Sequence, residues 1–127
     1  MKTYHSDNAP KAIGPYCQVI QAGSFYFLSG QTPIDPATGK LVEGGVEEQA
    51  RQVFINIDQV LQAAGLEPSH VVKSTVFLSS MDHFQAMNAA YAEFYGDHKP
   101  ARSAFAVKTL PLNCDVEIET IAYKEEE

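Results

Sequence analysis

Charged side chains interrupt two apolar, strand-like stretches near the end of the chain. Arg102 follows the turn signal at Pro100 and opens the first stretch, while Glu117 and Glu119 alternate with apolar residues in the second. A charge inside an apolar strand costs free energy unless it meets a partner or a ligand. We therefore hypothesise that Arg102 holds the carboxylate of a small substrate and that a carboxylate of the last strand handles water.

The chemistry of these residue types supports that division of roles. A guanidinium presents a planar fork that matches a carboxylate bidentately, and it stays charged at any working pH. An ionised Glu117 beside an arginine would position water or act as a general base. Alternation puts Glu117 and Glu119 on one face, and antiparallel pairing of the last two strands would bring one of them beside Arg102. The alternatives are an Arg–Glu salt bridge at an interface and, for Glu117, a solvated strand face.

Hydrophobic periodicity predicts the elements that carry these residues. Apolar residues at spacings of three and four predict a helix over 46–64 that Gly65 ends, and a second helix after Ser79 or Ser80 that Gly96 ends. Runs of β-branched and aromatic residues predict strands over 16–21, 25–29 and 71–78, ahead of the last two. The predicted order is β-β-α-β-α-β-β, an α/β (α+β) single domain over residues 1–127 with a mixed sheet.

The predicted strands carry apolar residues on both faces. We group Val72 with Val76 on the face opposite Phe77, and place Phe105 opposite Ala104. Two amphipathic helices cover only one face of the sheet they pack on, so the other face needs a second cover. We predict that this cover is another copy of the chain, in a closed ring, because homo-oligomers generally close.

Composition excludes several classes of partner. The 127 residues carry a net charge of −7 with only nine Lys and Arg, which argues against a nucleic-acid partner. No apolar run approaches the roughly 18–20 residues of a membrane span. The N-terminal residues lack the apolar segment of a signal peptide, and Cys17 and Cys114 lie outside any CxxC motif. These features predict a cytoplasmic protein with reduced thiols and no membrane partner.

Motifs for metals and nucleotide cofactors are missing from the sequence. The four histidines, at positions 5, 70, 83 and 98, form no HExxH, HxH or tight cluster with acidic residues. The chain has no GxGxxG, no Walker motif and no nucleophile elbow. We therefore expect neither a metal nor a cofactor.

A set of short motifs runs along essentially the whole chain. They are Ala12-Ile13-Gly14-Pro15-Tyr16, Ser29-Gly30-Gln31 with Pro33, Asp35-Pro36 with Thr38-Gly39, Gln49 with Asn56, Met87-Asn88 with Tyr91, Pro100-Ala101-Arg102-Ser103, and Val116-Glu117-Ile118-Glu119. Each motif is weak alone, but together they are highly specific. In this combination the sequence resembles the Rid family of reactive-intermediate deaminases, also called the YjgF family, and most closely its enamine/imine deaminase subgroup.

The resemblance implies a fold, an assembly and a reaction. The implied fold is chorismate-mutase-like, with two helices on one face of the sheet, and the implied assembly is a homotrimer with clefts between subunits. The implied activity is that of a 2-iminobutanoate/2-iminopropanoate deaminase. Such an enzyme hydrolyses enamines of the 2-aminoacrylate type, or their imine tautomers, to 2-oxo acids and ammonia without a cofactor.

The resemblance also implies roles for particular residues. Arg102 clamps the substrate carboxylate, Glu117 positions water, Tyr16 donates through its hydroxyl, Gly30 and Ala104 offer backbone, and Asn88 offers its side-chain amide. Many relatives carry a cysteine where this chain has Ala104, and alanine keeps the backbone donor. The alternatives are a half-buried strand aromatic for Tyr16 and, for Asn88, a helix residue pointing at a subunit interface.

Two other functions compete with the deaminase. The same clefts would serve a non-catalytic ligand-binding or regulatory module that senses 2-oxo acids or amino-acid metabolites. An RNA-cleaving activity, attributed to some relatives, fits poorly with the acidic charge of the chain.

Overall fold

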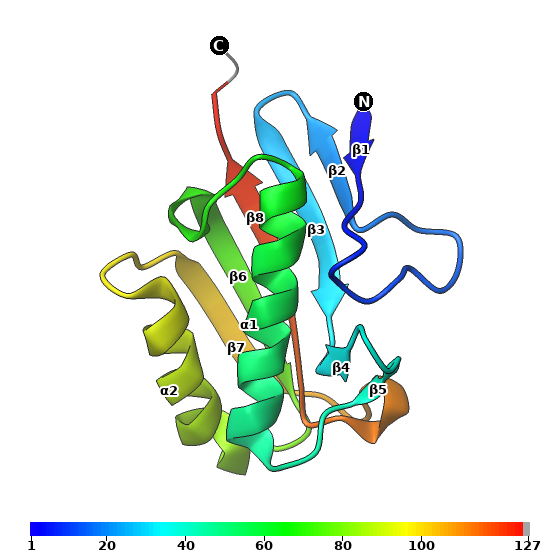
Figure 1. Ribbon diagram of the computed structural model, residues 1–127. Coiled ribbons are helices and arrows are strands. Elements are labelled where there is room, and N and C mark those ends of the chain that lie inside the picture. The colour runs from blue at the N-terminus through cyan, green and yellow to red at the C-terminus, as the bar shows by residue number, and fades with distance from the viewer. Residues whose placement is uncertain (126–127) are drawn as a thin grey trace.

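The computed structural model describes residues 1–125, and its centre is a six-stranded mixed sheet with both helices on one face (Figure 1). The helices are α1 (Val46–Ala63) and α2 (Phe84–Tyr95). The strands of the sheet are β1 (Lys2–Tyr4), β2 (Val19–Ala22), β3 (Phe25–Gln31), β6 (Val71–Leu78), β7 (Ala101–Ala106) and β8 (Val116–Tyr123). Strands β4 (Ile34–Asp35) and β5 (Lys40–Leu41) form a separate two-stranded ribbon. Three short 3-10 turns span Pro68–His70, Met81–His83 and Pro111–Asn113.

The predicted α+β architecture, a mixed sheet covered by two helices on one face, is confirmed, and both helices end where their glycines stand. Gly65 adopts a φ of +73° and Gly96 a φ of +60°, in the left-handed region that favours glycine. At the other end of α2, the Ser80 hydroxyl accepts a hydrogen bond from the N–H of Asp82 at 3.1 Å. This cap starts the 3-10 turn that leads into α2. No helix within residues 1–125 combines the length and apolar character needed to cross a lipid bilayer.

The order of strands differs from the prediction for the last two. The sheet runs β1-β2-β3-β8-β6-β7, so β6 lies between β7 and β8. Strand β7 pairs with β6 in parallel, with α2 as the crossover, and β8 pairs antiparallel with both β6 and β3. The expected antiparallel pairing of the last two strands is therefore wrong, because the loop after β7 carries the chain past β6 into the middle of the sheet.

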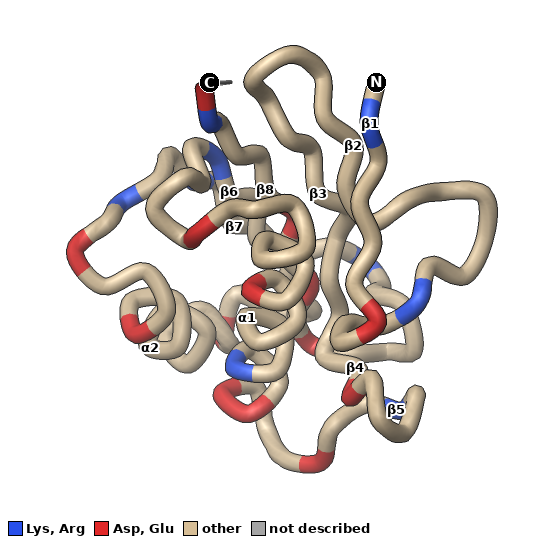
Figure 2. The backbone as a smooth tube through the Cα atoms, turned by 45° about the horizontal axis from the view of Figure 1, so that its top comes forward, with Lys and Arg blue, Asp and Glu red and all other residues tan. Residues whose placement is uncertain are grey.

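Charge is spread thinly over this scaffold. Figure 2 shows Lys and Arg at scattered points of the backbone, with no cluster of them over any one element. Acidic residues outnumber basic ones by 16 to 9. A binding surface for a nucleic-acid backbone needs clustered basic residues, and this backbone does not present them.

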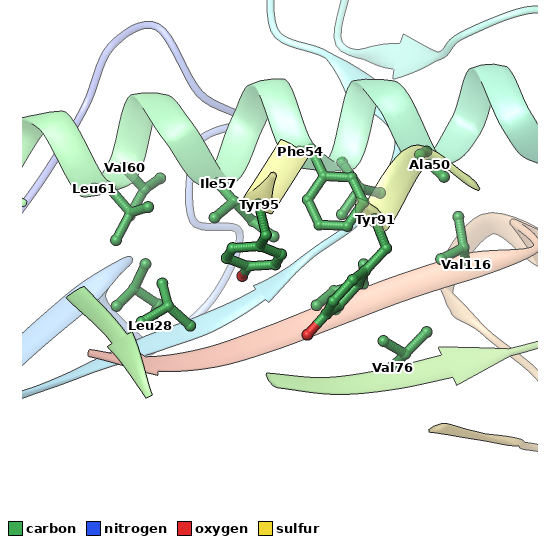
Figure 3. Packing of buried hydrophobic residues seen from close by; sticks show 14 of the residues in the cluster. Leu28, Ala50, Phe54, Ile57, Val60, Leu61, Val76, Tyr91, Tyr95 and Val116 are labelled. Carbon is green, nitrogen blue, oxygen red and sulfur yellow. The ribbon is translucent and has the colours of Figure 1, made fainter. Parts of the chain in front are cut away.

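The core fills the space between the helices and one face of the sheet. From α1, Ile57 and Leu61 meet Leu28 of β3, while Tyr91 and Tyr95 of α2 lie over the neighbouring strands (Figure 3). The buried positions of α1 follow the spacing of three and four that predicted the helix. Each Å² of apolar surface that is buried stabilises the fold by about 25 cal/mol, so this layer is the main source of stability.

The other face of the sheet has no covering helix or strand among residues 1–125. Phe25, Phe27, Val72 and Phe105 are each between 42% and 45% exposed. Val72 lies on this open face and not with Val76, because the register between β6 and β8 shifts between Val71 and Lys73. The prediction of an apolar second face is thus confirmed, with Val72 moved onto it by a bulge.

Candidate functional site

An irregularity in the pairing of β3 with β8 creates the first candidate site. The register shifts between Leu28 and Gln31, which places Gly30 inside a bulge and not beyond the end of the strand as the sequence predicted. Beside the bulge lies a hollow of about 380 Å³, which we call the bulge pocket. It is lined by Pro10, Lys11, Ile13, Tyr16, Gln18, Gly30, Gln31, Thr32, Ile34, Pro111, Leu112 and Glu117. Three of the predicted site residues, Tyr16, Gly30 and Glu117, therefore share one pocket.

Gly30 and Glu117 meet so closely that a side chain at position 30 would push the Glu117 carboxylate aside. A Cβ built on Gly30 would collide with Oε2 of Glu117 and lie 3.1 Å from its Cδ. The Glu117 carboxylate thus rests against bare backbone, and the glycine preserves this contact. Sequence alone marked both residues but did not show that they touch.

We expect Gly30→Ala to destabilise the fold by about 0.5–1.5 kcal/mol, because the new methyl group forces the Glu117 side chain out of its present rotamer. Urea unfolding measures the change. In a Glu117→Ala background the same substitution is expected to cost much less, since the colliding carboxylate is gone. Gly45→Ala is the matched control, because a Cβ there meets Glu48 only at an ordinary 3.6 Å. Equal costs in the two backgrounds would contradict the proposed overlap.

The environment of Glu117 shifts its ionisation. Burial raises the pKa of this carboxyl above its ordinary value of 4.5, and the nearby charge of Glu119 raises the pKa further. The expected neighbouring arginine is missing from the same chain: none of the ion pairs among residues 1–125 includes Glu117. A carboxyl group that holds its proton to higher pH is suited to proton transfer near neutrality.

Tyr16 lies in the loop before β2 and not in a strand. Its side chain is 52% exposed, and its hydroxyl accepts a hydrogen bond from the N–H of Ile13 at 3.3 Å. The predicted strand over 16–21 therefore begins later, at Val19, and the alternative of a strand aromatic is wrong for Tyr16.

The buried side chain of Gln18 ties this loop to the preceding residues, since it donates to the carbonyl of Pro10 at 2.9 Å and accepts from the N–H of Ser6 at 2.7 Å. The loop is held to the sheet by the N–H of Ser29 in β3, which donates to the carbonyl of Gln18 at 2.9 Å.

Asn56 of α1 fixes the opposite wall of the bulge pocket. Its side chain is fully buried, and its amide donates to the carbonyls of Thr32 and Ile34 at 3.0 and 2.9 Å. No role was predicted for Asn56 or Gln18, although Asn56 was visible as a polar residue at an apolar position of the predicted helix. Leu112 was missed as well; it lies at the rim with a φ of 56°, which is rare for a residue other than glycine.

Arg102 lies on the other side of the sheet, against α2. Its Nη1 donates to Oδ1 of Asn88 at 2.6 Å, and its guanidinium carbon lies 4.6 Å from the centroid of the Tyr91 ring. Asn88, Tyr91 and Arg102 line a second hollow of about 420 Å³ beside the end of α2. The salt-bridge alternative does not hold within the chain, since no ion pair among residues 1–125 includes Arg102.

Cross-strand partners assign Arg102 and Glu117 to opposite faces. Glu117 pairs with Phe77, which pairs with Phe105 on the open face, and the two rings lie 5.3 Å apart. Arg102 pairs with the fully buried Ser74 beneath the helices. Partners across a sheet point to the same side, so one chain does not bring the guanidinium and the carboxylate together.

Ala104 shares the face of Arg102 and exposes its backbone at the sheet edge. Its partner across β6 is Val76 of the core. The N–H of Val107 bonds to the carbonyl of Leu78 in β6 at 2.9 Å. Because N–H groups alternate sides along a strand, the N–H of Ala104 points away from β6, at the open edge that β7 forms. This donor is free to meet a ligand or another chain.

The acidic and thiol groups of the chain do not gather into a metal centre. Within residues 1–125, no three His, Cys, Asp or Glu side chains lie close enough together to hold an ion. Burial raises the pKa of the Cys114 thiol to about 11, so this group stays protonated at neutral pH. The predicted site residues thus divide into Arg102 and Asn88 beside α2, and Glu117 and Tyr16 at the bulge pocket.

Comparisons with known proteins place this geometry in a family. The model of the family described as Endoribonuclease L-PSP matches residues 6–124. A RutC family protein of Pyrococcus horikoshii is 52% identical over 120 residues, which are 94% of this chain and 95% of that protein. A 2-iminobutanoate/2-iminopropanoate deaminase of Salmonella typhimurium is 44% identical over 126 residues, covering 97% of this chain and 98% of that protein.

Solved structures agree with the sequence comparisons. The crystal structure of a putative endoribonuclease from Thermotoga maritima has a TM-score of 0.96 and 50% identity, and the match covers 99% of each chain. The structure of E. coli TdcF with bound serine has a TM-score of 0.93 and 38% identity, with 98% of this chain and 100% of that chain covered. The chain therefore belongs to the Endoribonuclease L-PSP family, which is the Rid or YjgF family.

Proposed function

We propose that the protein is a cofactor-free hydrolytic deaminase of enamine and imine intermediates, which releases 2-oxo acids and ammonia. The observation that carries this proposal is an arginine at an open sheet edge with no carboxylate partner among residues 1–125. An unneutralised guanidinium is a site for a small carboxylate. Relatives named 2-iminobutanoate/2-iminopropanoate deaminase, from 43% to 46% identical, support the same reaction.

The active unit is a homotrimer in this proposal, with each site at a seam between two copies. One chain carries Arg102 and Glu117 on opposite faces of its sheet, so a second copy must supply the missing half. The exposed phenyl rings of Phe25, Phe27 and Phe105 give that copy an apolar surface to cover. Light scattering tests the assembly, and a monomer at working concentration would contradict it.

Each group then has one task in the hydrolysis. Arg102 and the N–H of Ala104 hold the substrate carboxylate, which fixes C2 beside the bulge pocket of the next copy. The protonated Glu117 gives its proton to the terminal carbon of the enamine, forming the iminium ion. As a carboxylate, Glu117 then takes a proton from the water that adds to C2. Tyr16 donates a hydrogen bond to that water, and collapse of the adduct releases ammonia and the 2-oxo acid.

A trapping assay tests the reaction directly. A dehydratase generates 2-aminoacrylate from serine, semicarbazide captures the intermediate, and the rate of pyruvate release is followed with and without the protein. We expect the protein to accelerate pyruvate release over the uncatalysed rate. No acceleration, together with Arg102-dependent binding of pyruvate, would favour the non-catalytic sensor. RNA cleavage is tested in parallel, although the scattered basic residues give it no support.

The raised pKa of Glu117 predicts a pH profile. We expect kcat to fall as the pH rises past a midpoint above 4.5, because the first step needs protonated Glu117, and burial and Glu119 hold its proton to higher pH. The carboxylate of the bound substrate neutralises Arg102, so Arg102 no longer lowers the pKa of Glu117 across the seam. The pH limb of kcat, which reports the enzyme with substrate bound, should therefore lie at higher pH than the limb of kcat/KM, which reports the free enzyme. Glu119→Gln removes a repulsive charge and is expected to move the limb to lower pH. A limb that Glu119→Gln leaves in place would contradict this assignment.

A further inference from the structure

One face of α2 surrounds the guanidinium of Arg102. Phe84, Asn88 and Tyr91 are spaced by four and three residues, which aligns them along the helix. The guanidinium carbon lies 5.4 Å from the centroid of the Phe84 ring and 4.6 Å from that of Tyr91. The amide oxygen of Asn88 accepts from Nη1 at 2.6 Å. We call these three residues the neutral clamp.

All three residues of the clamp lack charge, which is unusual for the surroundings of an arginine in so acidic a chain. The protein has 16 acidic residues, and Arg51 on α1 pairs with Glu47 at 2.7 Å. Arg102, by contrast, takes part in none of the ion pairs among residues 1–125. Two ring faces and one amide oxygen fix its orientation without cancelling its charge.

We propose that Phe84, Asn88 and Tyr91 are positioning residues that set the carboxylate affinity of Arg102 by holding it in place and leaving it un-neutralised. This inference rests on the proposed function and assigns Asn88 to the arginine, not to the substrate. Asn88 occupies one hydrogen of Nη1, which leaves the other donors of the fork for a single bidentate carboxylate. The ligand class that the clamp selects is therefore a small monocarboxylate, which the 2-imino and 2-oxo acids of the proposed function are.

A charge at position 88 provides the sharpest test. Calorimetry measures pyruvate binding, and trapping kinetics measure kcat and KM separately. Asn88→Asp keeps an acceptor beside Nη1 but adds a competing carboxylate, so we expect it to weaken binding about tenfold or more. Asn88→Ala only removes an acceptor and is expected to lose less. Gln85→Glu makes the same change of amide to acid at an exposed position of α2 and should bind as the wild type does.

Stability separates a neutralised arginine from a damaged fold. In Asn88→Asp the new carboxylate can pair with Arg102, so urea unfolding should give a free energy of unfolding no lower than that of Asn88→Ala while pyruvate binds more weakly. A misfolded or distorted variant would lose both stability and binding. KM should rise while kcat changes less, because the clamp acts on carboxylate binding.

The two rings are tested by truncation. Phe84→Leu and Tyr91→Leu are each expected to weaken pyruvate binding about two- to thirtyfold, the range of a cation–π contact from partly exposed to desolvated. Tyr91→Phe keeps the ring and should lose less than Tyr91→Leu.

The outcomes distinguish the clamp from the proposed function. Arg102-dependent binding of pyruvate without turnover would overturn the deaminase and still allow the clamp to be measured. Asn88→Asp binding as tightly as Asn88→Ala at neutral pH would overturn the clamp and leave turnover unaffected. Wild-type protein that binds no pyruvate, or binds it equally well after Arg102→Ala, would overturn both.

Discussion

Arg102→Ala is expected to lower kcat/KM for hydrolysis of 2-aminoacrylate-derived imines by at least about 100-fold. Each hydrogen bond to a charged group contributes on the order of 1.5–3 kcal/mol, and the substitution removes a fork that makes two. Loss of the clamp also leaves the reacting carbon unplaced over the bulge pocket, so kcat should fall as well as KM rise. The trapping assay measures both parameters.

Arg102→Lys separates charge from geometry at the same position. Lysine keeps the positive charge but cannot bind a carboxylate with a planar fork. It also cannot fill the space between the two rings of the neutral clamp as a guanidinium does. We expect activity between that of Arg102→Ala and the wild type, with most of the loss in KM.

A second arginine provides the matched control. Arg51 lies on α1, partly exposed, and pairs with Glu47. Exposed i,i+4 pairs are worth about 0.3–0.5 kcal/mol, so Arg51→Ala should alter stability slightly and kcat/KM hardly at all. If Arg102→Ala retains activity within about threefold of Arg51→Ala, the carboxylate clamp is misassigned.

The elements of this fold were predictable because their causes are local. Strand β6 was predicted over 71–78 and is observed over Val71–Leu78. Helix α1 follows from its apolar spacing and the glycine after it. Strand β1 and the β4–β5 ribbon escaped prediction, because strands of three and two residues carry too little pattern to stand out from turns.

The pairing of strands was not predictable from the same evidence. Sequence neighbours often pair, and the short link between β7 and β8 favoured a hairpin. The parallel alignment of β7 with β6 is instead fixed by the α2 crossover, which a local pattern does not encode. The faces of Arg102 and Glu117 depend on that pairing, so the sequence identified both residue types and misjudged their relation.

Two bulges account for the remaining differences. One moves Val72 to the open face, and the other seats Glu117 against Gly30. A bulge inserts a residue whose presence is decided by the partner strand as much as by its own. Sequence patterns therefore identify Gly30 as a candidate site residue but do not show that the Glu117 side chain approaches it.

The separation of Arg102 and Glu117 on opposite faces leads to a second large effect. Two chains that are each inactive, Arg102→Ala and Glu117→Gln, should recover activity when they are assembled together. If each seam takes the guanidinium from one copy and the carboxylate from the next, random assembly of equal amounts leaves about a quarter of the seams intact. We therefore expect about a quarter of wild-type kcat per subunit, measured after co-expression or after joint refolding of the two variants.

A second mixture tests whether the site lies within one chain or between two chains. The double variant Arg102→Ala/Glu117→Gln is assembled in equal amounts with the wild type, so that half of all chains carry both intact residues. Sites built within one chain would then retain about half of the activity per subunit, whereas seams between chains would retain only about a quarter. Recovery in the first mixture with a quarter in the second requires a shared site. An inactive first mixture, together with half of the activity in the second, would instead show that each site is built within one chain and would contradict the shared site.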